Sequence, residues 1–264
     1  MTDEGQTTSG QGRGAEPAPI VDEIAPWMAA LATVTRAGLA GLTRVRVDGA
    51  IDEIPRTGPM IVAANHASNL DPVVIASSLM PRLGRRLQWL GKKELFAWPV
   101  VGWVAANGGV HPVDRSTADV EAYRLAKRIL DEGHALFVFP EGTRSHDGSL
   151  AEARDGVAVL ALRTGAPIVP VGIGGSYRVW PRGQKLPHPG GRVTVRVGSP
   201  FRLADELPEG TDRRAAKSLG TEVIMRRIAA LLPPDQRGRY AGSTDLDEPP
   251  PGPDRIQDDA PPEP

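Results

Sequence analysis

Three short apolar runs without polar interruption mark the middle of the chain. They are residues 61–64 (IVAA), 135–139 (ALFVF) and 168–173 (IVPVGI). Strands that are covered on both faces by helices carry such continuous runs, whereas a strand with one solvated face alternates between apolar and polar residues. The three runs therefore predict buried strands in a mostly parallel sheet.

Other segments predict the rest of that sheet and its helices. Residues 44–47 and 192–197 alternate, the second in the manner of an edge strand, and residues 87–90 and 108–115 suggest two more short strands. Helices are expected from Pro72 onward, over 94–106 with a bend near Pro99, from Ser116 to a stop at Gly133, over 155–164 and over 212–232. Strands alternating with helices indicate an α/β fold, and 264 residues with 40% hydrophobic content suffice for one large domain.

The apolar segment 24–42 has two readings. It has a single charge inside it, Arg36, and Arg44 follows closely, so the uninterrupted run is shorter than the roughly 20 apolar residues of a membrane span. An amphipathic helix lying in the membrane interface fits this pattern, with Trp27, Met28 and Leu31 at the headgroup boundary and Arg36 and Arg44 toward anionic lipid. A helix packed on the core fits it as well. Residues 94–106 carry two tryptophans and allow the same two readings.

Charge is distributed unevenly along the chain. Residues 1–23 hold five acids and one arginine, residues 245–264 hold seven acids and one arginine, and the formal total is −1, which leaves +9 for the domain between these tails. Both tails are polar or proline-rich and are expected to be disordered. A basic body is typical of proteins with anionic partners such as phospholipid surfaces, phosphorylated substrates or nucleic acid.

Several classes are disfavoured by what the sequence lacks. It has no cysteine, which excludes disulfides, thiolate metal sites and a cysteine nucleophile, and fits a reducing cytosol. No secretory signal, GxxxxGK[ST] loop or HExxH motif is present. A nucleic-acid binder is disfavoured because no zinc-finger pattern occurs and only 5% of residues are aromatic.

The candidate chemistry begins where the first buried strand stops. His66 and Asp71 flank the polar turn NHASNLDP, and ligands of open α/β sheets bind beyond the carboxyl ends of the strands. The carboxylate could accept a hydrogen bond from one imidazole nitrogen and leave the other as a general base. Alternatively, Asp71 only caps the following helix and His66 is an ordinary loop residue. No GxSxG elbow supplies a nucleophile, so the reacting hydroxyl is expected to come from the substrate.

Two further strand ends suggest an anion site. After the second buried strand, FPEGTRS places Gly142, Thr143 and Arg144 where glycine permits close backbone approach and a guanidinium can bind a phosphate. Arg115 ends GGVHPVDR in a similar position. The plain alternatives are a tight turn with a solvated Arg144 and an exposed Arg115 before a helix; the pair Lys92 and Lys93 could add charge or be solvated.

Taken together, these motifs resemble the glycerolipid acyltransferase family typified by 1-acyl-sn-glycerol-3-phosphate acyltransferases. NHASNLD at 65–71 is similar to the family's NHxxxxD block, and GGVHPVDR, FPEGTRS and IVPVGI are similar to its second, third and fourth blocks, in the same order. The resemblance spans about residues 47–197. It implies the glycerol-3-phosphate acyltransferase-like fold, a mostly parallel sheet flanked by helices, here preceded by an interfacial helix.

The resemblance also implies roles for the site residues. His66, oriented by Asp71, would deprotonate the hydroxyl of 1-acyl-glycerol-3-phosphate for attack on a thioester of CoA or acyl-carrier protein, giving phosphatidic acid. Arg115, Gly142, Thr143 and Arg144 would hold the acceptor phosphate and Glu141 would shape their loop, with no metal or redox cofactor. The implied location is the cytoplasmic face of a membrane containing anionic phospholipid. Acylation of another lysolipid, or a membrane-surface lipid-binding module without turnover, are the alternatives.

Overall fold

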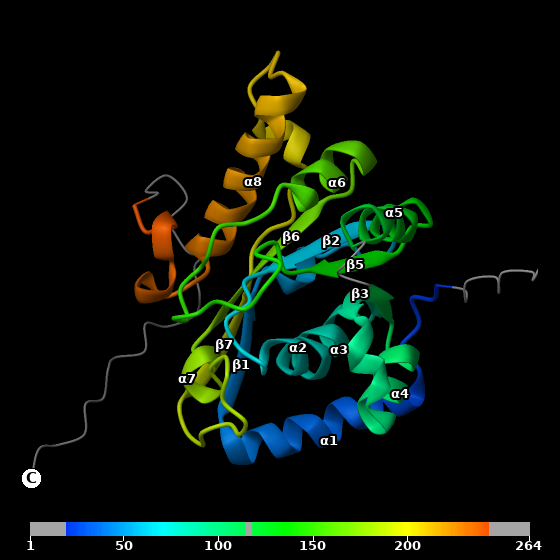
Figure 1. Ribbon diagram of the computed structural model, residues 1–264, viewed down its shortest axis with the longest axis vertical. Helices are drawn as coiled ribbons and strands as arrows, with labels where there is room; N and C mark the ends of the chain where they lie inside the picture. The colour runs from blue at the N-terminus through cyan, green and yellow to red at the C-terminus, as the bar shows by residue number, and fades with distance from the viewer. Residues whose placement is uncertain (1–19, 114–117, 243–264) are drawn as a thin grey trace, which may run out of the picture.

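A seven-stranded sheet organises the molecule. The computed structural model describes residues 20–113 and 118–242. The strands are β1 (Arg44–Gly49), β2 (Met60–Ala64), β3 (Leu87–Lys92), β4 (Val110–Val113), β5 (Ala135–Val138), β6 (Ile168–Gly174) and β7 (Arg192–Val197), and their spatial order is β1-β7-β6-β2-β5-β3-β4 (Figure 1). All neighbours are parallel except β6 and β7. The three uninterrupted apolar runs form the adjacent strands β6, β2 and β5, which confirms the expected central, mostly parallel sheet.

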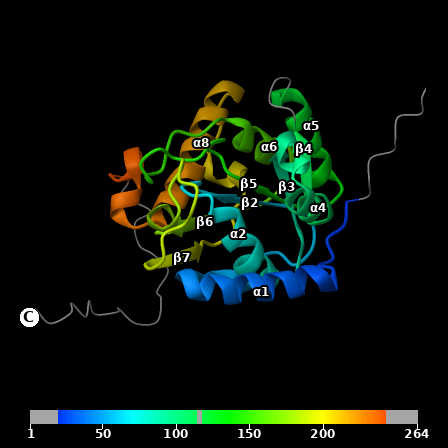
Figure 2. The same cartoon turned by 60° about the horizontal axis from the view of Figure 1, so that its bottom comes forward.

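Helices cover both faces of this sheet (Figures 1 and 2). One face carries α1 (Pro26–Leu42), α2 (Asp71–Val74), α3 (Met80–Leu83) and α4 (Pro99–Asn107), and the other carries α5 (Ala118–Asp131), α6 (Gly156–Thr164) and α8 (Arg213–Ala230). In β2, Met60, Val62 and Ala64 belong to the apolar core on the first face, and Ile61 and Ala63 to the core on the second. Burial on both sides explains why this strand shows no alternation.

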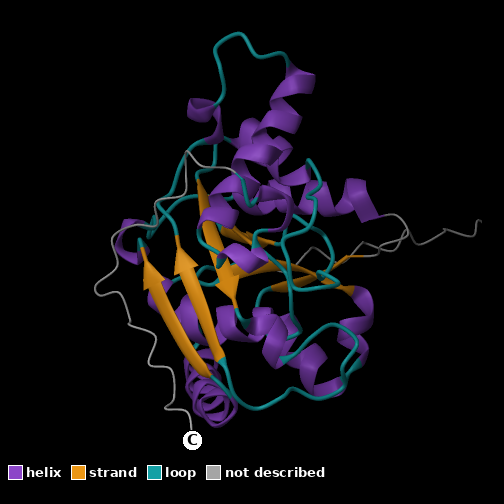
Figure 3. Cartoon of the chain, turned by 90° about the vertical axis from the view of Figure 1, so that its left-hand side faces the viewer, coloured by secondary structure: helices purple, strands orange, loops and turns teal. Residues whose placement is uncertain are grey.

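The edge position expected for residues 192–197 is wrong. β7 lies between β1 and β6, parallel to the first and antiparallel to the second. Val193, Val195 and Val197 are fully buried on one face, whereas Arg192 is exposed on the other. Figure 3 looks onto this end of the sheet, where no helix lies in front of β1 and β7. The alternation therefore indicates that only one face of the strand is buried. It does not indicate that the strand lies at the edge of the sheet.

Two predicted helices are divided in the structure. The helix after the first turn consists of α2, a π-helical turn η2 (Ile75–Leu79) and α3, and the segment 94–106 consists of a 3-10 helix η3 (Lys93–Ala97) followed by α4. The second break coincides with Trp98 in extended conformation before Pro99, as expected for a residue preceding proline. The predicted start at Ser116 lies outside the described residues.

Helix α1 confirms the predicted N-terminal helix, and it packs along the first face of the sheet. Met28, Ala32 and Leu39 are buried against the core, whereas Leu31 and Val34 on other sides of the helix are exposed. Among the residues that the structure describes, no helix has the length and apolar character needed to cross a membrane.

Contacts with the domain begin before the expected boundary at residue 24. Asp22 forms an ion pair of 2.5 Å with the buried Arg85 and lies 2.9 Å from Nδ1 of His134. The backbone carbonyl of Val21 accepts a hydrogen bond from Gln88. Val21 and Asp22, assigned from composition to the acidic tail, are therefore hydrogen-bonded to the domain.

Candidate active site

The site begins at the carboxyl end of β2, where Asn65 ties two central strands together. Its buried amide oxygen accepts from the backbone N–H of Ile173 at 2.7 Å, and its amide nitrogen donates to the carbonyl of Ile173 at 3.0 Å. The amide thus takes the place of the backbone N–H and C=O that would otherwise pair with Ile173, and it holds the ends of β2 and β6 in register. His66 follows directly and leaves the sheet at its carboxyl edge.

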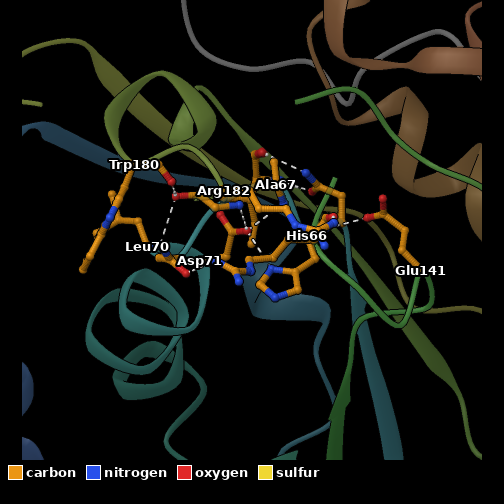
Figure 4. A network of polar contacts seen from close by, with 12 residues as sticks. His66, Ala67, Leu70, Asp71, Glu141, Trp180 and Arg182 are labelled. Carbon is orange, nitrogen blue, oxygen red and sulfur yellow. Dashed lines mark hydrogen bonds and ion pairs between the residues drawn. The ribbon is translucent and has the colours of Figure 1, made fainter. Parts of the chain in front are cut away.

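His66 and Asp71 are brought together as the sequence predicted (Figure 4). Nδ1 of His66 lies 3.0 Å from Oδ2 of Asp71, and that oxygen also accepts from the N–H groups of Ala67 at 2.8 Å and Ser68 at 2.7 Å. The carboxylate thus turns back to the loop instead of capping α2. Because the carboxylate accepts, Nδ1 carries a hydrogen, and in the neutral imidazole the lone pair is then on Nε2. The Asp71 side chain is fully buried, whereas 17% of the His66 side chain is exposed.

Aromatic packing sets the plane of the imidazole. The ring of His66 stacks on Phe139, with centroids 3.9 Å apart and planes 10° from parallel. Phe139 in turn meets Phe137 edge-on, and Phe137 packs on Trp89. The acid and the aromatic ring together leave the imidazole little rotational freedom, so Nε2 points in a defined direction.

Glu141 joins the two loops that carry the predicted site residues. One of its carboxylate oxygens accepts from the backbone N–H of His66 at 2.6 Å and the other from that of Ala151 at 2.9 Å. The residue is only 4% exposed, and burial raises the pKa of its carboxyl to about 7, against the lowering effect of these two hydrogen bonds. Both oxygens are occupied by backbone groups, which is a loop-supporting arrangement rather than a contact open to substrate.

The predicted anion loop turns tightly beside His66. Gly142 has a φ of +68° and donates to the carbonyl of Phe139, a conformation that favours glycine. Gly142 and Thr143 are exposed, whereas Arg144 is half-buried and donates to Oδ1 of Asn69 in the His66 loop. Arg144 is thus held against the His66 loop and is not a freely solvated side chain.

The other predicted cations are placed differently. Arg115 lies outside the described residues. Lys92 and Lys93 are exposed at the end of β3 and the start of η3, on the far side of β5 from β2 in the strand order.

Sequence reasoning missed a third loop at this site. Beyond α7 (Ser176–Val179), the carbonyl of Trp180 accepts from Oγ of Ser68 at 2.7 Å, and Arg182 donates to the carbonyl of Arg144 at 3.0 Å. The available signal was that GGSYRVWPR follows the carboxyl end of a buried strand, the edge at which His66 and Arg144 were placed. Across residues 20–113 and 118–242, no group of three His, Cys, Asp or Glu side chains is arranged to hold a metal ion.

Comparison with known proteins agrees with these motifs. Residues 44–174, from β1 through β6, match the family model described as Acyltransferase. The 1-acyl-sn-glycerol-3-phosphate acyltransferase LPAT1 of Arabidopsis thaliana is 30% identical over 67% of this chain and 49% of its own length. A lyso-ornithine lipid O-acyltransferase of Pseudomonas aeruginosa is 35% identical over 62% of this chain and 58% of its own. The chain thus spans about half the length of the curated relatives it matches.

A solved structure supports the same assignment at the level of the fold. The crystal structure of the 1-acyl-sn-glycerophosphate (LPA) acyltransferase PlsC from Thermotoga maritima superimposes with a TM-score of 0.62 and 28% identity, covering 77% of this chain and 79% of that one. The matched family region contains His66, Asp71, Glu141 and Arg144, the residues whose geometry is described above. The chain therefore belongs to the acyltransferase family typified by the 1-acyl-sn-glycerol-3-phosphate acyltransferases.

Proposed function

We propose that this protein transfers a fatty acyl group from a thioester donor to the free hydroxyl of 1-acyl-sn-glycerol 3-phosphate, forming phosphatidic acid and a free thiol. The observation that carries the proposal is the His66–Asp71 pair, in which Asp71 contacts Nδ1 and leaves Nε2 without a partner among the described residues, with Arg144 held against the same loop. The names of the relatives support the choice of reaction. The donor is acyl-CoA or acyl-carrier protein, and no metal or redox cofactor takes part.

The proposed chemistry needs only a base that returns its proton. Nε2 of His66 takes the proton of the acceptor hydroxyl as that oxygen attacks the thioester carbonyl carbon. The tetrahedral intermediate collapses with cleavage of the C–S bond, and the imidazolium returns the proton to the leaving sulfur. Asp71, which accepts from Nδ1, stabilises the positive imidazole between these steps. Arg144, Gly142, Thr143 and Arg115 are proposed to bind the acceptor phosphate, and Glu141 to hold their loop in place.

A direct assay tests the reaction and its acceptor. The purified protein is incubated with oleoyl-CoA or oleoyl-acyl-carrier protein and a panel of lysolipids, and the products are identified by mass. Phosphatidic acid formed by the wild type and absent with His66→Ala is the expected result. Lyso-ornithine lipid belongs in the panel because the relative at 35% identity is named for it. If only lyso-ornithine lipid is acylated, it replaces 1-acyl-sn-glycerol 3-phosphate as the acceptor. If no acceptor is acylated, the alternative of a lipid-binding module without turnover is favoured.

We also propose that the protein binds a membrane surface peripherally, at the cytoplasmic face, through α1 and α4. Figure 2 shows α4 beside one end of α1, and the rings of Trp27 and Trp103 lie 5.0 Å apart. Val34 of α1, Trp98 just before α4 and Val100 of α4 are 69%, 67% and 76% exposed. Withdrawing a 16-carbon chain fully into water would cost on the order of 12 kcal/mol, at about 0.8 kcal/mol per CH₂, so capture of the acceptor at the interface is favoured.

The lipid contacts expected from the sequence need adjustment in two places. Met28, expected at the headgroup boundary with Trp27 and Leu31, is buried in the core. Arg36, expected to meet anionic lipid, donates to the carbonyl of Ser77 and to the hydroxyl of Thr33. The proposed membrane face, defined by Trp27, Leu31, Val34, Trp98, Val100 and Trp103, therefore includes α4 as well as α1.

A further inference from the structure

Arg182 lies where three loops meet beside His66. The loop after α7 is pinned to the His66 loop by the hydrogen bond from Ser68 to the carbonyl of Trp180 and by a β-bridge between Ser68 and Pro181. The indole N–H of Trp180 closes the same loop on the carbonyl of Gln184. None of these contacts involves the Arg182 side chain, which extends from a loop held by others (Figure 4).

The guanidinium of Arg182 spans to the loop that carries Arg144. Its Nη1 donates to the carbonyl of Arg144 at 3.0 Å and lies 2.9 Å from Nε2 of His146. Since a guanidinium has only donors, Nε2 of His146 must accept, and the imidazole hydrogen is on Nδ1. Nε and Nη2 of Arg182 make no hydrogen bond within the described part of the chain, so donors remain for a ligand.

Arg144 and Arg182 donate to neutral partners among the described residues, whereas several other arginines form ion pairs. Arg178, for example, pairs with Asp235 at 2.9 Å. By contrast, Arg144 donates to an amide oxygen and Arg182 to a carbonyl and an imidazole, and neither forms an ion pair with any residue that the structure describes. Asp147, three positions after Arg144, accepts instead from Ser145 and Ser149, and these bonds lower its pKa to about 2. Two guanidinium groups carried by contacting loops thus have no carboxylate partner among the described residues.

We propose that Arg182 is a specificity-determining residue that binds, together with Arg144, the phosphate monoester of the acceptor. The inference rests on the proposed function, in which the reacting hydroxyl and the phosphate occupy neighbouring carbons of glycerol. Once the hydroxyl reaches Nε2 of His66, the phosphate must lie beside the His66 loop, to which Arg144 is hydrogen-bonded and the loop of Arg182 is pinned. Planar guanidinium groups bind phosphate oxygens through paired hydrogen bonds, and Nδ1–H of His146 is a further donor nearby.

Binding to a soluble acceptor tests the inference without turnover. The probe is 1-hexanoyl-sn-glycerol 3-phosphate, titrated calorimetrically into wild type, Arg182→Gln and the control Arg178→Gln, four residues earlier and paired with Asp235. Loss of a hydrogen bond to a charged group predicts binding weakened on the order of 10- to 100-fold in Arg182→Gln and unchanged in the control. Arg182→Lys keeps the positive charge but lacks the paired donors of the planar guanidinium, so its affinity should lie between those of the wild type and Arg182→Gln. Equal binding by Arg182→Gln and wild type overturns the proposal.

Two companion titrations identify what the site recognises. 1-Hexanoylglycerol, which lacks the phosphate, should bind wild type and Arg182→Gln alike, and a difference there would contradict phosphate recognition. Inorganic phosphate should compete only weakly with the lipid phosphate, whereas equally tight binding would mark a site for free phosphate and overturn the assignment to the acceptor.

Steady-state kinetics separate this inference from the proposed function. With lysophosphatidic acid as acceptor, Arg182→Gln should raise the acceptor KM on the order of 10- to 100-fold and leave the KM for oleoyl-CoA unchanged. A rise confined to the donor KM would assign Arg182 to the donor and refute the inference. If the wild type failed to acylate lysophosphatidic acid yet bound the hexanoyl probe through Arg182, the proposed reaction would fall and the phosphate site would stand.

Discussion

At the residue scale, the proposed mechanism depends on one imidazole nitrogen. Removing it with His66→Ala should lower kcat on the order of 10²- to 10⁴-fold, the usual contribution of a general base. The fold should persist, because the contacts of His66 with Glu141 and Ser145 are made by its backbone. Turnover and thermal unfolding measured on the same preparation check both parts. A folded His66→Ala protein with near wild-type activity would refute the mechanism.

Asp71→Asn tests the charge at that pair separately from its hydrogen bonds. The amide oxygen can occupy the position of Oδ2 and still accept from His66, Ala67 and Ser68, while the amide nitrogen takes the place of Oδ1, which has no partner within the described residues. The negative charge beside the imidazolium is lost. We expect at least a tenfold lower kcat and a smaller cost in unfolding free energy, about 1–3 kcal/mol for the unpaired amide group. Loss of folding with intact specific activity in the folded fraction would contradict this role.

Glu141 should make stability depend on pH. Its carboxyl has a pKa of about 7 in the folded chain against an ordinary value of 4.5, so the folded state retains its proton over a range in which the unfolded chain has lost it. The resulting stability is complete below pH 4.5 and is lost as pH rises through 7, by about 3 kcal/mol in total. The unfolding free energy of the wild type, relative to Glu141→Gln, should therefore fall between pH 4.5 and 8.

The control for this titration is Glu152→Gln, a mostly exposed neighbour in the same loop. Its unfolding free energy should follow that of the wild type at every pH. A constant difference between wild type and Glu141→Gln across the range would show that the buried carboxyl does not titrate there.

At the scale of elements, α1 and α4 should act together in membrane binding. The double variant Val34→Glu/Val100→Glu places charge at two exposed positions. It removes two aliphatic side chains, each of which would contribute about 1.5–3 kcal/mol to membrane binding if fully buried in lipid. Cosedimentation with liposomes containing phosphatidylglycerol should fall at least tenfold. Leu219→Glu, at an aliphatic side chain that is 43% exposed on α8 across the sheet, is the control and should bind as the wild type does. Equal binding by all three proteins would place the membrane contact elsewhere.

At the scale of the whole molecule, the segment before α1 contributes to the stability of the domain. Arg85 is 3% exposed and its ion-pair partner is Asp22, so a chain shortened by residues 1–42 would lose α1 and leave a buried guanidinium without its carboxylate. Asp22→Ala should cost on the order of 3 kcal/mol of unfolding free energy in urea titrations. The exposed neighbour substitution Glu23→Ala should cost little. Equal stability of the two variants would show that the pair is dispensable.

Local pattern alone identified much of this protein. The uninterrupted apolar runs predicted β2, β5 and β6 and their central place, because a strand buried on both faces requires apolar side chains at every position. The placement of His66 and Asp71 was also predictable, since both belong to one short strand-to-helix turn. Arg144 could be assigned to the same edge of the sheet because parallel strands end together.

Only the tertiary structure decided the interior position of β7, the contacts of Glu141 with two backbone amides, the docking of residues 20–23 and the arrival of Arg182 at the site. Each depends on segments far apart in the chain: Ser68 bonds Trp180 across 112 positions, and His66 bonds Glu141 across 75. Periodicity and turn chemistry describe a residue's near neighbours in sequence. The partners that complete this site are chosen by how helices and loops pack on the shared sheet, which no local pattern encodes.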